Sequence, residues 1–136
     1  MLRRSEALLQ SRPDVPSAAL NPEMTAEERF QNTTLRPILQ TQNNLLLAVF
    51  RHYIGKHKNA YFALGSEARE GYIENAIQKD IKFRNALKGM IIGQFTLEEY
   101  EGYKQHSSAL NKRMMQMVIN RIKDQMQLFE APVLLQ

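Results

Sequence analysis

The apolar residues of this chain recur every three or four positions, and this spacing constrains the fold more than any other feature of the sequence. They fall into three segments, at about residues 26–58, 66–92 and 96–129. Such spacing places side chains on one face of an α-helix, whereas a half-buried strand would alternate apolar and polar residues. No sustained alternation and no Asn-Gly or Asp-Gly turn is present. The pattern predicts an all-α fold, an antiparallel bundle of three to four helices.

The first predicted helix has a clear start and an internal proline. Thr25-Ala26-Glu27-Glu28 matches a capping box, in which the threonine oxygen and the glutamate each satisfy a backbone amide that has no helical partner. Pro37 lies inside the helix, and its ring displaces the carbonyl of Thr33, four residues earlier. We therefore expect a kink or a break at this point.

The second segment has candidate caps at both ends and one in the middle. Ser66 is the predicted N-cap, and Gly93 is placed to end the helix in the left-handed conformation. Asp80 is a candidate N-cap for a second, shorter helix, so the segment is either one helix or two.

The third segment is predicted to be a long C-terminal helix at the centre of the bundle. It opens with a second capping box, Thr96-Leu97-Glu98-Glu99, and is apolar nearly all round from 114 to 119. A helix that is buried on two sides contacts two neighbours, which indicates a central position or a dimer seam. The candidate interface residues are Met115, Ile119, Ile122, Met126 and Phe129.

Proline content marks a boundary near the N-terminus. Residues 12–23 hold three of the five prolines, which favours an extended linker. We interpret residues 1–23 as a flexible N-terminal extension or the product of an upstream translation start. The helical bundle domain is predicted to span 24–130, and residues 131–136 form an apolar C-terminal tail.

Composition excludes several classes of protein. The chain has no cysteine, which rules out disulfides, thiol catalysis and cysteine-zinc sites. Its longest apolar run, 45–50, is far shorter than the roughly 20 residues that cross a bilayer. We expect a cytoplasmic protein with no membrane partner. The formal net charge of +4 is a mild bias, whereas dedicated nucleic-acid binders usually carry clustered basic stripes.

No catalytic or metal-binding motif is present. His52, His57 and His106 are the only histidines, and none has an acidic or histidine neighbour at the spacing that metal ligands require on a helix. A glycine-rich phosphate loop and a nucleophilic serine elbow are also missing. We therefore expect no metal and no cofactor, and favour a protein that is not an enzyme.

Four polar residues fall on apolar helix faces: Gln42, Asp80, Arg84 and Arg121. Buried polar groups need partners, because an unpaired one costs about 1–3 kcal/mol. One interpretation is a structural network, with Asp80 and Arg84 as a surface pair four residues apart. The alternative is a polar pocket in which all four converge on a small ligand.

The end of the first predicted helix is basic. Arg51, Lys56 and Lys58 are candidates for a surface that binds RNA or a ribonucleoprotein, with Tyr61 and Phe62 nearby to stack on bases. The alternative is a solvated helix terminus followed by an aromatic core anchor.

Three pieces of sequence carry a resemblance to a known family: Leu35-Arg36-Pro37-Ile38-Leu39 with Gln42-Asn43, the run from Tyr72 to Asp80, and the run from Phe83 to Thr96. On these pieces, residues 25–130 resemble a family of short, uncharacterised, all-helical bacterial proteins. The resemblance implies a helical fold and a family start near Met24, and it brings no established site residue. Proteins of this kind often carry an automatic glyoxalase label, although the sequence lacks the strands and the His, Gln and Glu ligands of that enzyme fold.

The sequence thus favours a non-enzymatic protein-interaction or scaffold module that forms a homodimer. The alternatives are RNA or ribonucleoprotein binding through the basic helix end, and a small-ligand binder or glyoxalase-like enzyme.

Overall fold

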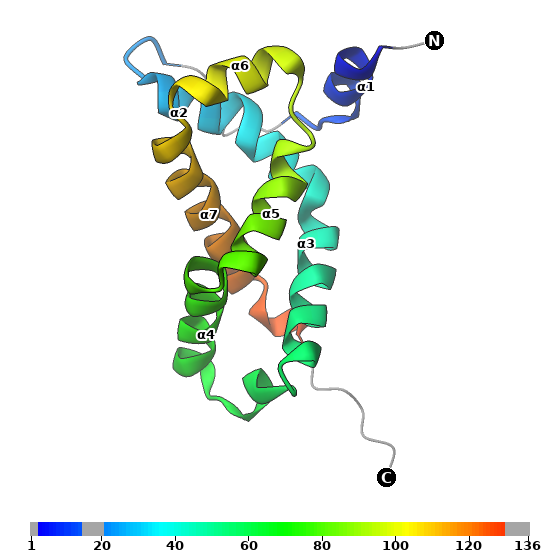
Figure 1. The fold of residues 1–136 in the computed structure, drawn as a ribbon, viewed down its shortest axis with the longest axis vertical. Coiled ribbons are helices and arrows are strands. Elements are labelled where there is room, and N and C mark those ends of the chain that lie inside the picture. The colour runs from blue at the N-terminus through cyan, green and yellow to red at the C-terminus, as the bar shows by residue number, and fades with distance from the viewer. Residues whose placement is uncertain (1–2, 15–20, 130–136) are drawn as a thin grey trace.

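The computed structural model describes residues 3–14 and 21–129 and shows an all-helical protein, with no strand in those ranges (Figure 1). This confirms the predicted all-α class, whereas the antiparallel bundle of three to four helices stays a prediction. Within the same ranges, no helix combines the length and the apolar character that a membrane crossing requires.

The longer helices lie along the long axis of the molecule (Figure 1). The α-helices are α1 (Arg4–Ser11), α2 (Ala26–Phe30), α3 (Arg36–Lys56), α4 (Ser66–Lys79), α5 (Ile81–Ile92), α6 (Leu97–Gln105) and α7 (Ser107–Asp124). Helices α3, α5 and α7 all contact one another, and α4 packs on α5 and α7. Helix α6 crosses the end of the molecule where α2 begins, and α1 lies near that end.

The first predicted helix is helical throughout 26–56, but its hydrogen bonding changes along the way. Thr25 caps α2 by accepting a hydrogen bond from the Glu28 backbone N–H. A π-helical turn, Gln31–Leu35, then leads into α3, in which Pro37 is the second residue. Proline has no N–H to donate and displaces the carbonyl four residues back. The switch from α-helical to π-helical hydrogen bonding therefore lies directly before Pro37, where the sequence predicts a disrupted helix. A kink of the helix axis stays a prediction.

Asp80 divides the second segment into α4 and α5. Its backbone is extended (φ −84°, ψ 99°), and its side chain accepts a hydrogen bond from the Phe83 N–H at 3.2 Å. The two-helix alternative is therefore confirmed. Two predicted caps are wrong: Gly65 is the N-cap of α4, and Gly93 is right-handed (φ −60°, ψ −16°).

The third segment is two helices rather than one long helix. Its Thr96–Glu99 capping box is present with both reciprocal hydrogen bonds, but the chain leaves helical geometry at His106 (φ −137°, ψ 32°). His and Ser are weaker helix formers than Ala or Leu, and two serines follow His106. The Tyr103 hydroxyl donates a hydrogen bond to Asn111 Oδ1 at 2.6 Å, which links the two helices across the corner.

The apolar side of α7 is buried in the protein's own core. Met115, Ile119, Ile122 and Phe129 are each at most 3% exposed, and Met126 packs against them half-buried. Helices α3, α4, α5 and α6 all contact α7. These contacts account for the two apolar sides of the helix. Four of the five residues proposed as a dimer interface are buried within one chain, Met126 is half-buried, and the dimer interface stays a prediction.

The N-terminal residues contact the rest of the fold. Residues 4–11 form α1, although none of its side chains is fully buried. The domain boundary at Met24 stays a prediction, and the predicted tail, 131–136, lies outside the described residues.

Candidate functional site

The four polar residues predicted to share a pocket lie in separate places. Gln42 Nε2 donates to the Met90 carbonyl of α5 at 3.1 Å, and Asp80 caps α5. Arg84 is half-buried, and among the described residues no ion pair joins it to Asp80. Arg121 Nη1 donates to Asn43 Oδ1 on α3 at 3.2 Å. The Arg84 backbone N–H donates to the Asp80 carbonyl at 2.8 Å, one helical turn away. No side-chain hydrogen bond joins any two of the four within the described ranges, so their polar side chains do not form one connected site there.

Asp80 has a structural partner besides its cap. The Tyr53 hydroxyl donates to Asp80 Oδ2 at 2.9 Å. The Phe83 N–H and then this hydroxyl favour the charged carboxylate and lower the pKa of Asp80. Burial, followed by the Asp80 hydrogen bond, raises the pKa of Tyr53 to about 12. This pair links α3 to the start of α5.

The basic helix end is exposed but partly engaged. Lys56 and Lys58 are exposed, and Lys58 has a left-handed backbone (φ 62°). Arg51 donates to the Leu128 carbonyl at 3.1 Å, and its guanidinium lies 5.7 Å from the centroid of the Phe129 ring. An open cleft of about 660 Å³ runs beside these residues, with Ala48, His52, Gly55, Asn59 and Phe62 in its wall. One of the three predicted basic groups therefore also fixes the C-terminal end of the described chain.

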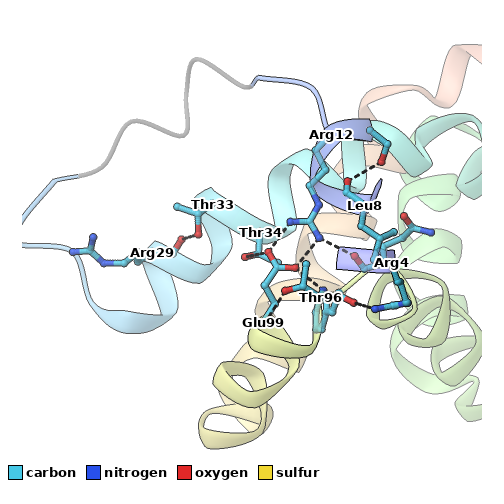
Figure 2. A network of polar contacts seen from close by, with 11 residues as sticks. Arg4, Leu8, Arg12, Arg29, Thr33, Thr34, Thr96 and Glu99 are labelled. Carbon is cyan, nitrogen blue, oxygen red and sulfur yellow. Dashed lines mark hydrogen bonds and ion pairs between the residues drawn. The ribbon is translucent and has the colours of Figure 1, made fainter. Parts of the chain in front are cut away.

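A network of polar contacts fastens α1 to the junction of α5 and α6 (Figure 2). Arg12 makes a bidentate ion pair with Glu99, with nitrogen–oxygen distances of 2.6 and 2.7 Å. It also donates to the Gln94 carbonyl at 2.7 Å, while Arg4 donates to the carbonyls of Phe95 and Gly93 at 2.7 and 2.9 Å. We call this set the α1 clamp: two arginines that satisfy carbonyls past the end of α5 and a carboxylate at the start of α6.

Glu99 is the centre of the α1 clamp. Besides the two nitrogens of Arg12, it accepts hydrogen bonds from the Thr34 hydroxyl at 3.0 Å and the Thr96 N–H at 2.9 Å (Figure 2). Burial by itself would raise the pKa of Glu99, but the contacts with Arg12, Thr96 and Thr34 outweigh it and hold the pKa below its usual value. Only 8% of the Arg12 side chain and 16% of the Glu99 side chain are exposed. Arg12 and Glu99 thus neutralise each other inside the fold, and their remaining hydrogen bonds are made to other groups of the same network.

Two other arginines meet at an open cleft between the start of α3 and the end of α7. The cleft has a volume of about 500 Å³. Its wall contains Gln31, Arg36, Leu39, Gln40, Met117, Asn120, Arg121, Asp124 and Gln125. We call it the α3–α7 cleft. Arg36 and Arg121 are the only basic residues in its wall, and Asp124 is the only acidic one.

Neutral amide groups hold these two arginines in place. Arg36 Nε donates to Asn32 Oδ1 at 2.8 Å, one turn earlier. Arg121 donates to Asn43, whose amide also exchanges hydrogen bonds of 2.7 and 2.9 Å with Gln125. Within residues 3–14 and 21–129, neither arginine forms an ion pair with a carboxylate. Their positions are therefore fixed while their charges are not neutralised by a direct partner.

The electrostatics of the cleft follow from this arrangement. Burial and then the nearby charge of Arg36 lower the pKa of Arg121, with Asp124 acting in the opposite direction. An arginine nevertheless keeps its proton in proteins, so both guanidinium groups stay charged. A third arginine, Arg113, donates to Gln31 Oε1 in the cleft wall at 2.8 Å. Two like charges beside one concave surface create a positive potential that favours an anion.

Sequence reasoning found Arg121 but missed Arg36, Asn43, Arg12 and Glu99 as members of sites. In the sequence, Arg36 stands out only within Leu35-Arg36-Pro37-Ile38-Leu39, a piece that carries the family resemblance. Its distance from Arg121 is 85 positions along the chain, and no periodic pattern links them. Glu99 had a visible signal, the Thr96–Glu99 capping box, but the approach of Arg12 to it depends on tertiary structure.

The described ranges contain no group of three His, Asp or Glu side chains arranged to hold a metal ion. No protein-family model, curated protein sequence or solved structure matches the chain. The resemblance to small helical bacterial proteins stays a prediction, and the case for a function depends on the geometry of the sites.

Proposed function

We propose that this protein is a non-enzymatic binding module that holds a small anionic ligand, a carboxylate or a phosphate, in the α3–α7 cleft. The observation that carries the proposal is the pair of arginines, Arg36 and Arg121, which share one cleft and whose guanidinium groups, among the described residues, donate only to side-chain amides. Guanidinium groups bind carboxylate and phosphate through paired N–H donors, so they are suited to such a ligand.

The surroundings of the two arginines support the proposal. Side-chain amides of Gln31, Gln40, Asn120 and Gln125 line the cleft and offer both donors and acceptors. A volume of about 500 Å³ lies within the range of small-molecule sites. The helical scaffold, which we propose is an antiparallel bundle, brings the start of α3 and the end of α7 together.

The other two function hypotheses, a homodimeric scaffold and RNA binding, depend on residues outside the α3–α7 cleft. The homodimer and scaffold hypothesis rested on Met115, Ile119, Ile122, Met126 and Phe129, of which all but the half-buried Met126 are buried within a single chain. The RNA hypothesis rests on Arg51, Lys56 and Lys58, at a site other than the α3–α7 cleft. A cytoplasmic location is part of our proposal and is compatible with either ligand class.

The test is calorimetric titration of the full chain with sodium phosphate and with sodium acetate, alongside Arg121→Gln. We expect binding of at least one of the two anions and a loss of about tenfold or more in affinity for Arg121→Gln, because one charge-assisted contact contributes about 1.5–3 kcal/mol. Lys112→Gln, which removes an exposed charge from the same helix, is the matched control and should bind as the wild type does. Equal affinities for the wild type and Arg121→Gln would contradict the proposal.

RNA binding is distinguished by its location and its salt dependence. An RNA oligonucleotide should bind through several phosphates and lose affinity steeply between about 50 and 200 mM salt. If Arg51→Gln weakens that binding while Arg121→Gln does not, the basic helix end, and not the α3–α7 cleft, is the functional surface.

A further inference from the structure

Asp124 gives the α3–α7 cleft a negative pole. It is an exposed member of the same wall as Arg36 and Arg121, and it is the last residue of α7. Because it follows Arg121 by three positions, the two side chains lie on the same face of the helix. Among the described residues it forms no ion pair with either arginine. The carboxylate is therefore available to a ligand.

The position of Asp124 on its helix strengthens this pole. The C-terminal end of an α-helix carries a partial negative charge from its carbonyl groups, so a cation is favoured there and an anion is not. A carboxylate at this end adds to the negative potential. One small cleft thus presents two guanidinium groups and, beside them, a carboxylate on the negative end of α7.

The wall of the cleft also includes an apolar portion. Met117 of α7 is half-buried in this wall, and Leu39 of α3, which also borders the cleft, is only 1% exposed. Most small-molecule sites combine apolar walls with a few polar groups that set the orientation of the ligand. Here the polar groups differ in sign, and Met117 offers the apolar surface that can contact a hydrocarbon group.

We propose that the ligand is zwitterionic: an α-amino acid with an apolar side chain, whose carboxylate is bound by Arg36 and Arg121 and whose ammonium group faces Asp124. This inference rests on the proposed function, since it names the chemical class of the anion. It adds the requirement that the ligand carry a positive charge next to its carboxylate.

The test compares L-leucine with 4-methylpentanoate, the same molecule without the amino group, by calorimetric titration of the full chain. We expect leucine to bind at least tenfold more tightly than the acid. Asp124→Asn should weaken leucine to the level of the acid and leave the acid unchanged or slightly tighter. Arg121→Gln should weaken both ligands. Asp14→Asn, a change of the same kind at another exposed position, is the control for the altered net charge and should have no effect.

The outcomes separate this inference from the proposed function. If leucine and the acid bind equally, or if Asp124→Asn leaves leucine binding unchanged, the zwitterionic ligand is refuted while anion binding stands. The same holds if phosphate binds through Arg121 and neither organic ligand does. If no anion binds, both proposals fail. Circular dichroism of each variant confirms that the comparison is made between folded proteins.

Discussion

The protein has two pairs of arginines in contrasting surroundings, and the contrast indicates which pair serves structure. In the α1 clamp, Arg4 and Arg12 donate to backbone carbonyls and to the Glu99 carboxylate. In the α3–α7 cleft, the guanidinium groups of Arg36 and Arg121 donate only to amide oxygens within the part of the chain that the structure describes. The chemical group is the same in both places. The difference lies in whether the protein supplies the anion.

This difference has an energetic basis. A guanidinium that is removed from water requires compensation by hydrogen bonds and an opposite charge. The clamp provides both within the chain, and the Arg12 side chain is 8% exposed. The cleft stays open to solvent, so water and any bound anion provide what Asn32 and Asn43 do not. An anionic ligand in the cleft would supply the opposite charge that the two guanidinium groups lack, and would thereby stabilise the folded protein.

The largest expected effect is on the α1 clamp. Glu99→Ala removes the carboxylate that accepts from Arg12 and Thr34, and it also breaks the reciprocal bond of the capping box. We expect a loss of about 2–3 kcal/mol in the free energy of unfolding, from the combined loss of a partly buried ion pair and a cap. Urea unfolding measures it. Glu98→Ala, an exposed neighbour in the same helical turn, should change stability by less than about 0.5 kcal/mol. Equal effects for the two variants would mean that the clamp does not stabilise the fold.

The next effect is on the α3–α7 cleft, where we expect a change in ligand affinity and little change in stability. Arg36→Gln should lower phosphate or carboxylate affinity about tenfold, because one of the two charged donors is lost. Its free energy of unfolding should stay within about 0.5 kcal/mol of the wild type, since removal of one like charge offsets the lost bond to Asn32. Calorimetric titration and urea unfolding of the same sample measure both quantities. If Arg36→Gln lost stability and kept its affinity for the anion, Arg36 would be a structural residue and the α3–α7 cleft would not be the binding site.

A smaller effect concerns Asp80, for which the sequence offered a helix cap and, as one alternative, membership of a ligand pocket, and which the structure places at a helix start. Asp80→Ala should cost about 1 kcal/mol of stability through loss of the α5 cap. Anion affinity should remain that of the wild type. Glu70→Ala, an exposed change within α4, is the control. Loss of anion binding in Asp80→Ala without loss of stability would return Asp80 to the ligand site.

The smallest effect is a pH dependence of the α1 clamp. The folded-state pKa of Glu99 is lowered from its ordinary value of 4.5, so its ionised form is favoured by folding. The resulting stabilisation is fully present above about pH 4.5 and is lost as the pH falls through the lower, folded-state pKa. Urea unfolding from pH 7 to pH 3 should therefore show the wild type and Glu99→Gln converging as the solution becomes more acidic. A difference between them that stays constant across this range would contradict the assigned role of the carboxylate.

Much of the fold could be predicted because it is encoded locally. Regular apolar spacing indicated helices, the Thr96–Glu99 box marked the start of α6, and Asp80 signalled a break between α4 and α5. The corner at His106 was missed because the apolar spacing continues across it. The left-handed end expected at Gly93 was wrong, and its carbonyl is instead satisfied by Arg4 from the far end of the sequence.

The candidate site was harder to predict because its parts come from distant positions. Arg121 stood out as a polar residue on an apolar face, but its partner Asn43 lies 78 residues away. The two apolar sides of α7 left open a central position in the bundle or a dimer seam, and in the structure α3, α4, α5 and α6 all contact this helix. A pattern on one helix cannot distinguish neighbouring helices of the same chain from a second copy.

The most direct test of the contrast between the clamp and the cleft is an NMR titration that observes the arginine side-chain Nε–Hε signals of the full chain as sodium phosphate or sodium acetate is added. At constant ionic strength, we predict that the signals of Arg36 and Arg121 move and saturate together with at least one of these anions. Those of Arg12 and Arg4 should stay in place, because their acceptors are already within the fold. Signals that all shift slightly and without saturation, or an effect confined to Arg51, would contradict the assignment of the α3–α7 cleft as the binding site.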